Sequence, residues 1–242
     1  MTGGGIAMTA RISGVAALAA ALGIVPGAGM GTGQAAPGTP NPPSRTATLY
    51  GDPAAAAPFW HYQEYDDDCV EMAVADVIGE LNRDAPSERA IVKLAQTMPS
   101  TAHHGPIYAK RGKPRAGTGT YFGDEPALLA HYGIHAVNTD KDSAKKTGVP
   151  TGMKALEQDL AEGRKMIVGV NAELIWREPV EDKTSDGEPE ANHALVVTGV
   201  DTAAGIVHLN DSGSEDGRDE QVPIGIFTRS WDTSDDQMTV TA

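Results

Sequence analysis

The spacing of apolar residues changes along this chain from a helical period to a strand period, and this change limits the folds that it can adopt. Three segments repeat apolar residues every three or four positions, as amphipathic helices do: 69–82, 87–98 and 125–132. Three short apolar runs bounded by turn-forming residues come later and favour strands: 165–171, 193–200 and 206–210. This order predicts an α+β fold, with N-terminal helices packed on a C-terminal antiparallel sheet.

Further elements complete the predicted outline. Residues 153–162 have a helical period and are followed by Gly163, a helix-ending residue. Short strands are predicted over 134–137, 221–231 and 237–241, and the last two are expected to finish the sheet. The segments without any period, 99–120 and 177–191, are predicted to be loops.

The first 46 residues have a different composition from the rest of the chain. Residues 1–35 hold no acid and one base, Arg11, which precedes an apolar run too short to span a bilayer comfortably. A base, such a run and small residues near Ala35 are typical of a secretory signal. Residues 36–46 are Pro-rich and predict a disordered tether, which leaves 47–242 as the folded domain. We therefore expect a protein that is secreted or held in the cell envelope, with no membrane contact after signal cleavage. If it stays uncleaved, the apolar run could instead act as a membrane anchor.

Size and charge narrow the class of protein further. The 242 residues are 40% hydrophobic, which suffices for one ordinary domain with its own core. The formal net charge is −14, and such a surface repels nucleic-acid phosphates, so nucleic acid is not an expected partner. We expect the protein to be a monomer without a cofactor. We also expect no metal site, because no set of Cys, His and carboxylate residues has metal-site spacing and the acidic loop 211–220 lacks EF-hand spacing.

Cys69 is the only cysteine of the chain, so no disulfide can form within it. A free cysteine is commonly a small buried hydrophobe, but this one stands at the start of a predicted helix. Unpaired backbone N–H groups and the helix dipole favour a thiolate there and can stabilise an oxyanion on the thiol's target. The position therefore favours a nucleophile.

A thiol nucleophile needs a base, and the base needs an orienting partner. His193 opens an apolar strand, and Asp211 follows the next strand. If these strands form a hairpin, the two residues become cross-strand neighbours within side-chain reach. Asn210 is a rival orienter, and only one of Asn210 and Asp211 should face His193, because strand neighbours point to opposite faces. Gln63, six residues before Cys69, could supply a second oxyanion contact.

These residues and their order resemble papain-like cysteine peptidases and, more closely, the bacterial C39-like peptidase family. The resemblance is carried by Gln63-Glu-Tyr-Asp-Asp-Asp-Cys69-Val, His193-Ala-Leu-Val-Val-Thr-Gly199 and Val207-His-Leu-Asn-Asp-Ser-Gly213. It implies a papain-like fold and a thiol peptidase or amide hydrolase that acts on a peptide or protein substrate. The roles that it implies are nucleophile for Cys69, base for His193, orienter for Asp211 and oxyanion contact for Gln63.

Two features leave other functions open. The chain has Val70 where family members often have Gly, and Asp66, Asp67 and Asp68 place negative charge beside the thiol, which disfavours a thiolate. A catalytically inactive peptidase-like binding domain is therefore one alternative. A Cys-dependent acyl transferase is another, because hydrolysis and transfer share an acyl-enzyme. If the three acids line the cleft, they could select a basic group or an N-terminal amine on the substrate.

Overall fold

The computed structural model describes residues 48–109 and 119–242. The secretory signal predicted for 1–35 and the tether predicted for 36–46 lie outside these residues, as does Ala47, the expected start of the domain. These boundaries stay predictions, and so does the secreted location that depends on them.

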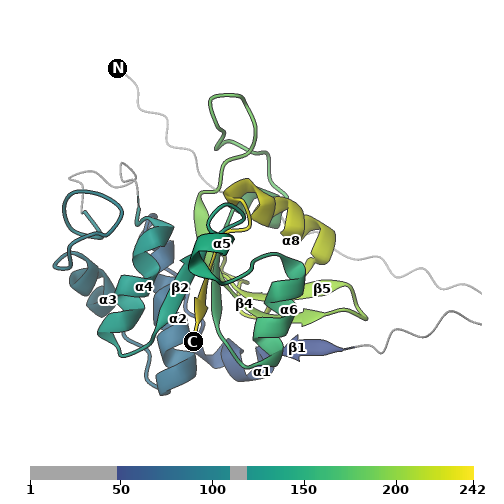
Figure 1. The fold of residues 1–242 in the computed structure, drawn as a ribbon, viewed down its shortest axis with the longest axis horizontal. Coiled ribbons are helices and arrows are strands. Elements are labelled where there is room, and N and C mark those ends of the chain that lie inside the picture. Colours follow the sequence, from purple (N-terminus) through teal and green to yellow (C-terminus); the bar gives the residue numbers. More distant parts are fainter. Residues whose placement is uncertain (1–47, 110–118) are drawn as a thin grey trace, which may run out of the picture. The chain divides into compact units, whose positions relative to one another are not determined.

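Seven antiparallel strands in the described residues form one sheet (Figure 1). Six of them follow the order β2-β7-β3-β4-β5-β6, and β1 pairs with β4 outside this order. Their bounds are Leu49–Gly51 (β1), Ala136–Thr139 (β2), Met166–Val170 (β3), His193–Asp201 (β4), Ile206–Asn210 (β5), Glu220–Pro223 (β6) and Met238–Thr241 (β7). β3 pairs with the first half of β4, and β1 pairs with its last three residues on the same edge. β5 covers the other edge, so β4 lies at the centre of the sheet.

Helices cover both faces of this sheet (Figure 1). The α-helices are Pro53–Ala56 (α1), Cys69–Asn82 (α2), Glu88–Ala95 (α3), Glu125–His131 (α4), Ala144–Thr147 (α5), Met153–Ala161 (α6), Ala172–Trp176 (α7) and Ile224–Trp231 (α8). Three single 3-10 turns accompany them: Ala57–Phe59 (η1), Phe122–Asp124 (η2) and Asp232–Ser234 (η3).

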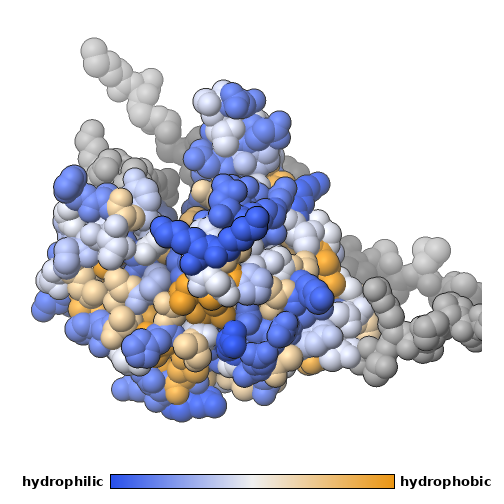
Figure 2. Space-filling model, viewed as in Figure 1, coloured by the Kyte–Doolittle hydropathy of each residue, from blue (hydrophilic) through white to orange (hydrophobic). Residues whose placement is uncertain are grey.

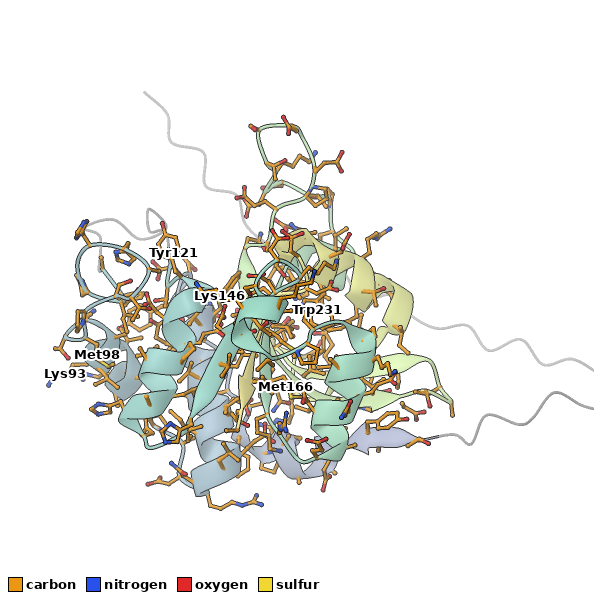
Figure 3. All side chains as sticks on the ribbon, viewed as in Figure 1. Lys93, Met98, Tyr121, Lys146, Met166 and Trp231 are labelled. Carbon is orange, nitrogen blue, oxygen red and sulfur yellow. The ribbon has the colours of Figure 1, made fainter. Side chains whose placement is uncertain are left out.

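Alternate residues of β4 enter two separate hydrophobic cores, because successive side chains of a strand point to opposite faces. Ala194 and Val196 pack with α2, α3 and α4, whereas Leu195 packs with α6, α7 and α8. Met166 and Trp231, labelled in Figure 3, belong to this second core and are fully buried. A strand packed on both faces and hydrogen-bonded on both edges is a rigid platform for the residue at its start, His193.

The predicted α+β fold, with helices packed on an antiparallel sheet, is confirmed, but the strand predicted over 221–231 is wrong beyond Pro223. Residues from Ile224 to Trp231 form α8. In this helix the rings of Phe227 and Trp231 lie 5.4 Å apart in the second core, whereas in a strand they would lie about 13 Å apart. Burial of both rings in the second core therefore favours the helix in a segment whose apolar pattern fits a helix and a strand.

Smaller differences concern short elements. β2 begins at Ala136, two residues after its predicted start, and the four- and five-residue helices α1, α5 and α7 were not predicted, because so short a helix has no period to detect. The charged loop 177–192 projects at the top of the view and is hydrophilic (Figure 2). No helix within 48–109 or 119–242 is both long and apolar enough to cross a membrane.

Candidate active site

Cys69 is the first residue of α2, as the sequence predicts. This helix runs between the sheet and the helices α3 and α4, and its residues from Val70 to Glu80 are all buried. The thiol itself is only partly buried and lines a cleft. Packing of the helix on all sides thus holds its N-terminus, and with it the thiol, at the edge of the core.

His193 and Asp211 are in direct contact, as their hairpin predicts. The Nε2 atom of His193 lies 2.6 Å from Oδ1 of Asp211. The pairing of β4 with β5 ends at Val196 and Asn210. His193 and Asp211 lie beyond this last pair, and their side chains meet diagonally and not directly opposite each other. His193 is 5% exposed and Asp211 is 0% exposed, so the pair is shielded from water.

The carboxylate of Asp211 accepts two further hydrogen bonds. The indole Nε1–H of Trp176 donates to Oδ2 at 2.9 Å, and the backbone N–H of Gly213 donates to Oδ1 at 2.8 Å. The ring of Trp176 also lies 5.6 Å from the ring of His193. Trp176 was not among the predicted site residues, because it ends the unpredicted helix α7 next to the charged loop. Its one signal in the sequence is an isolated Trp beside such a loop.

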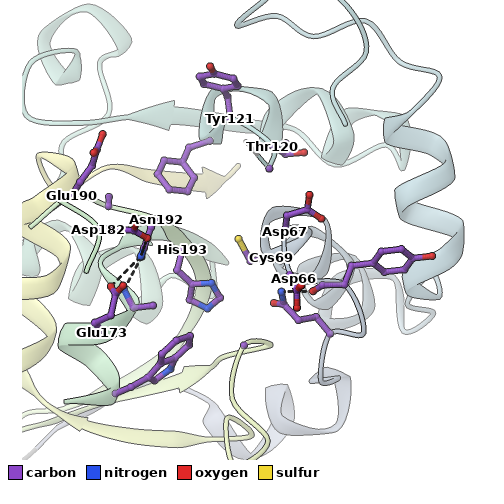
Figure 4. A pocket seen from close by; sticks show the side chains of 18 of the residues that line it. Asp66, Asp67, Cys69, Thr120, Tyr121, Glu173, Asp182, Glu190, Asn192 and His193 are labelled. Carbon is purple, nitrogen blue, oxygen red and sulfur yellow. Dashed lines mark hydrogen bonds between the residues drawn. The ribbon is translucent and has the colours of Figure 1, made fainter. Parts of the chain in front are cut away.

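Opposing effects set the protonation of this pair. Burial by itself would lower the pKa of His193, but the charge and hydrogen bond of Asp211, together with a hydrogen bond to the Cys69 side chain, raise this pKa well above its ordinary value. Burial would likewise raise the pKa of Asp211, yet its bonds to His193 and Trp176 lower it. At neutral pH the site therefore favours a protonated imidazole at His193, which lies next to Cys69 in Figure 4.

Asn210, the rival orienter, lies on the opposite side of the strand. Its amide Nδ2 donates to Oδ2 of Asp76 at 2.9 Å and to the carbonyl oxygen of Ala56 at 3.2 Å. Its Oδ1 accepts from the backbone N–H of Asp219 at 3.2 Å. These partners hold Asn210 against α2 and away from His193, so of the two candidates Asp211 is the one that contacts the imidazole.

Gln63 lines the same cleft as Cys69, with its amide held at both ends. The Ser212 hydroxyl donates to Oε1 of Gln63 at 2.9 Å, and Nε2 of Gln63 donates to the carbonyl oxygen of Tyr65 at 2.8 Å. A second backbone bond joins Gln63 N–H to the Ser212 carbonyl oxygen at 2.9 Å. Because an amide nitrogen carries two hydrogens, one donor of Gln63 is left for another acceptor.

The three acids before Cys69 have different environments. Asp66 and Asp67 line the cleft, and Asp67 accepts a hydrogen bond from the hydroxyl of Tyr108 at 2.6 Å. Asp68 is 0% exposed and makes no capping bond to α2. Burial, and after it the neighbouring carboxyl of Glu88, raises the pKa of Asp68 to about 9. At neutral pH Asp68 is therefore mostly uncharged, and it opposes a thiolate less than the sequence suggests.

The cleft has a volume of about 1000 Å³. Cys69, Asp66 and Asp67 lie on one wall, and His193, Asn192 and Glu173 lie on the other (Figure 4). Gln63 and Trp176 also line the cleft. A cavity of this size accommodates several residues of an extended peptide. Among the described residues no group of three or more His, Cys, Asp and Glu side chains is arranged to hold a metal ion.

Comparison with known proteins identifies the family. Two curated relatives, the uncharacterized proteins Mb1299c of Mycobacterium bovis and Rv1268c of Mycobacterium tuberculosis, are each 55% identical to this chain over 216 residues, which cover 88% of the chain and 93% of the relative. A crystal structure described as a C39-like peptidase of Bacillus anthracis matches 81% of this chain and 98% of its own with a TM-score of 0.54. At 18% identity that likeness concerns the fold alone. The sequence matches the Peptidase_C39 like family over residues 53–239, and the chain belongs to this family.

Proposed function

We propose that this protein is a thiol hydrolase that cleaves a peptide or amide bond at Cys69. The single observation that carries the proposal is the contact of His193 with Asp211 in the same peptide-sized cleft that Cys69 lines. Acyl transfer to a thiol requires a nucleophile, a base beside it and a third group that orients the base.

In the first step the thiolate of Cys69, whose proton is held by the imidazolium of His193, attacks the carbonyl carbon of the substrate. The oxyanion that forms is stabilised by the first N–H groups of α2 and by the free amide hydrogen of Gln63. His193 then gives its proton to the departing amine as the carbon–nitrogen bond breaks, which leaves a thioester on Cys69.

In the second step a water molecule replaces the amine. His193 takes a proton from this water, and the resulting hydroxide attacks the thioester carbonyl. The second oxyanion uses the same donors and collapses as the carbon–sulfur bond breaks, which releases the carboxylic acid and restores the thiolate of Cys69 beside the imidazolium of His193. Throughout both steps Asp211 stays ionised and stabilises the imidazolium.

Alkylation with iodoacetamide tests the nucleophile directly, because Cys69 is the only cysteine and all labelling reports on it. An ordinary thiol is only a few per cent ionised at pH 7, so we expect the His193→Ala variant to react about tenfold or more slowly than wild type. Peptide-library hydrolysis should fall to background in Cys69→Ala.

The structure offers a matched control for this experiment. His208 forms a second His–Asp pair, with Nδ1 at 2.7 Å from Oδ1 of Asp219, but it does not line the cleft. His208→Ala should therefore alkylate at the wild-type rate. Equal alkylation rates in wild type and His193→Ala at pH 7 would exclude His193 as the base.

The same experiments distinguish the alternatives. Rapid alkylation with no turnover of any peptide, but saturable peptide binding, would favour an inactive binding domain. A product that carries an added amine in place of water would identify an acyl transferase, since both reactions proceed through the same thioester. Export of the protein, which we propose from residues 1–35, would be seen as its presence outside the cytoplasm with those residues removed.

A further inference from the structure

We propose that the cleft beside Cys69 selects peptides that carry a lysine or arginine side chain, and that Glu173 and Asp182 bind this cation. The proposal rests on the proposed function in that it takes this cleft as the substrate site. Of the three acids in the sequence-based hypothesis, Asp66 and Asp67 line the cleft and Asp68 does not. The proposal adds carboxylates of the opposite wall, which the sequence did not reveal.

Carboxylates line both walls of the cleft (Figure 4). They are Glu64, Asp66 and Asp67 on the wall of Cys69, and Glu173, Asp182 and Glu190 on the wall of His193. None of the described residues that line the cleft is a lysine or an arginine. A cleft lined mostly by negative charge attracts cationic ligands and rejects acidic ones.

Glu173 and Asp182 are held close together by the residue that precedes the candidate base. The amide Nδ2 of Asn192 donates to Oε2 of Glu173 at 3.0 Å and to Oδ2 of Asp182 at 2.6 Å (Figure 4). Its Oδ1 accepts from the backbone N–H of Ala172, which fixes the amide on the start of α7. Two oxygens that share one donor lie within about 6 Å of each other, so a single cation can contact both carboxylates.

The paired carboxylates repel each other, and a cation between them removes this repulsion while it gains two attractions. An arginine guanidinium offers several N–H donors in one plane, and a lysine ammonium offers three. Since the pair adjoins His193 through Asn192, a side chain bound there lies near the carbonyl that Cys69 would attack. The cation is therefore expected within a few residues of the scissile bond.

Exposed tyrosines add a second attraction for cations. Tyr62, Tyr65 and Tyr121 line the cleft and are 48%, 38% and 50% exposed. The face of an aromatic ring attracts ammonium and guanidinium groups, and it also packs against the aliphatic part of lysine or arginine. Both features favour a long basic side chain over a free inorganic cation.

Binding to the Cys69→Ala variant tests the proposal without turnover. The probes are blocked pentapeptides that differ only at the central residue, which is lysine, arginine, norleucine or glutamate. Norleucine has the length of lysine without its charge, so the norleucine-to-lysine ratio of Kd values isolates the ionic contribution. Because an exposed ion pair strengthens an interaction by about 1.4- to 5-fold, two nearby carboxylates predict a ratio of about ten. This ratio should fall as salt is raised from 50 to 500 mM, at roughly constant norleucine binding.

Glu173→Gln with Asp182→Asn should reduce the norleucine-to-lysine ratio of Kd values to about two. The control is Asp84→Asn with Asp142→Asn, which changes the net charge equally at exposed sites outside the cleft and should leave the ratio near ten. The full chain is used, because the bases of 110–118 adjoin Gly119 in the sequence and lie outside the described residues.

Three results would overturn the proposal: equal binding of lysine and norleucine peptides, tighter binding of the glutamate peptide, or an equal loss in the control variant. These outcomes are separate from a failure of the proposed function. Hydrolysis of neutral and basic peptides at equal rates by wild type would refute the selectivity and leave the hydrolase in place. Selective binding of basic peptides without any hydrolysis would refute the proposed hydrolase and support the selectivity of the cleft.

Discussion

Replacing Asp211 by asparagine should disrupt the site in a way that a second substitution reverses. All three partners of the Asp211 carboxylate are donors: Nε2–H of His193 and the N–H of Gly213 to one oxygen, and Nε1–H of Trp176 to the other. Asparagine keeps the shape but offers one acceptor and one donor group. Its amide nitrogen must therefore face at least one N–H group.

The expected loss of stability in Asp211→Asn follows from the burial of this side chain and from the number of hydrogen bonds that it loses. The orientation that keeps the oxygen on His193 and Gly213 turns the new NH₂ group toward Trp176. A hydrogen bond to a buried charged group is worth about 1.5–3 kcal/mol, and an unsatisfied buried donor costs about 1–3 kcal/mol more. We expect Asp211→Asn to lower the free energy of unfolding by about 3–5 kcal/mol at pH 7, measured by urea denaturation.

Trp176→Phe provides the decisive comparison, because it removes the indole donor and keeps an aromatic ring against His193. In wild type this change breaks a bond to a carboxylate and should cost about 1.5–3 kcal/mol. In the Asp211→Asn background it removes the unsatisfied donor, so the cost should fall to near zero. The double-mutant cycle should thus give a coupling energy of about 2 kcal/mol. An equal cost of Trp176→Phe in both backgrounds would refute this account of how Asp211 is held.

Three further predictions follow from neighbouring residues. In Gly213→Ala the new Cβ would lie 3.0 Å from Cε1 of His193, so the ring must shift; we expect hydrolysis to fall about 10- to 100-fold, with a stability loss of only about 1–3 kcal/mol. Asp68 stays neutral in the folded state from its ordinary pKa of 3.8 up to about 9, while the unfolded chain ionises there. Wild-type stability should therefore decrease as pH rises through this window, by at most about 1.4 kcal/mol per pH unit from this group, and urea unfolding at pH 5 and 8 should show a smaller decrease in Asp68→Asn. Asn210→Ala should cost about 2–4 kcal/mol, because Asp76 loses its buried partner, yet leave the alkylation rate of Cys69 within about twofold of wild type.

Local sequence patterns suffice to predict the main helix and the central hairpin of this protein. The helical period of 69–82 predicts α2 at its observed bounds, and the two apolar runs around the turn at 201–205 predict the hairpin of β4 and β5. These elements are defined by residues close in sequence, so periodicity and turn chemistry suffice to find them. Because Cys69, His193 and Asp211 stand at the ends of these elements, the order of the candidate site residues could be inferred with them.

Only the tertiary structure decided which side chains surround those residues. Trp176 reaches Asp211, and Asn192 joins Glu173 to Asp182, through the unpredicted helix α7 and a loop without a period. Tertiary structure also decided the conformation of α8. Its apolar residues fit a strand as well, and burial of its two rings in the second core favours the helix. Contacts between segments far apart in sequence depend on how the sheet and helices pack, and no local pattern records them. The charge of Asp68 depends on its burial for the same reason, since desolvation by the folded chain raises its pKa.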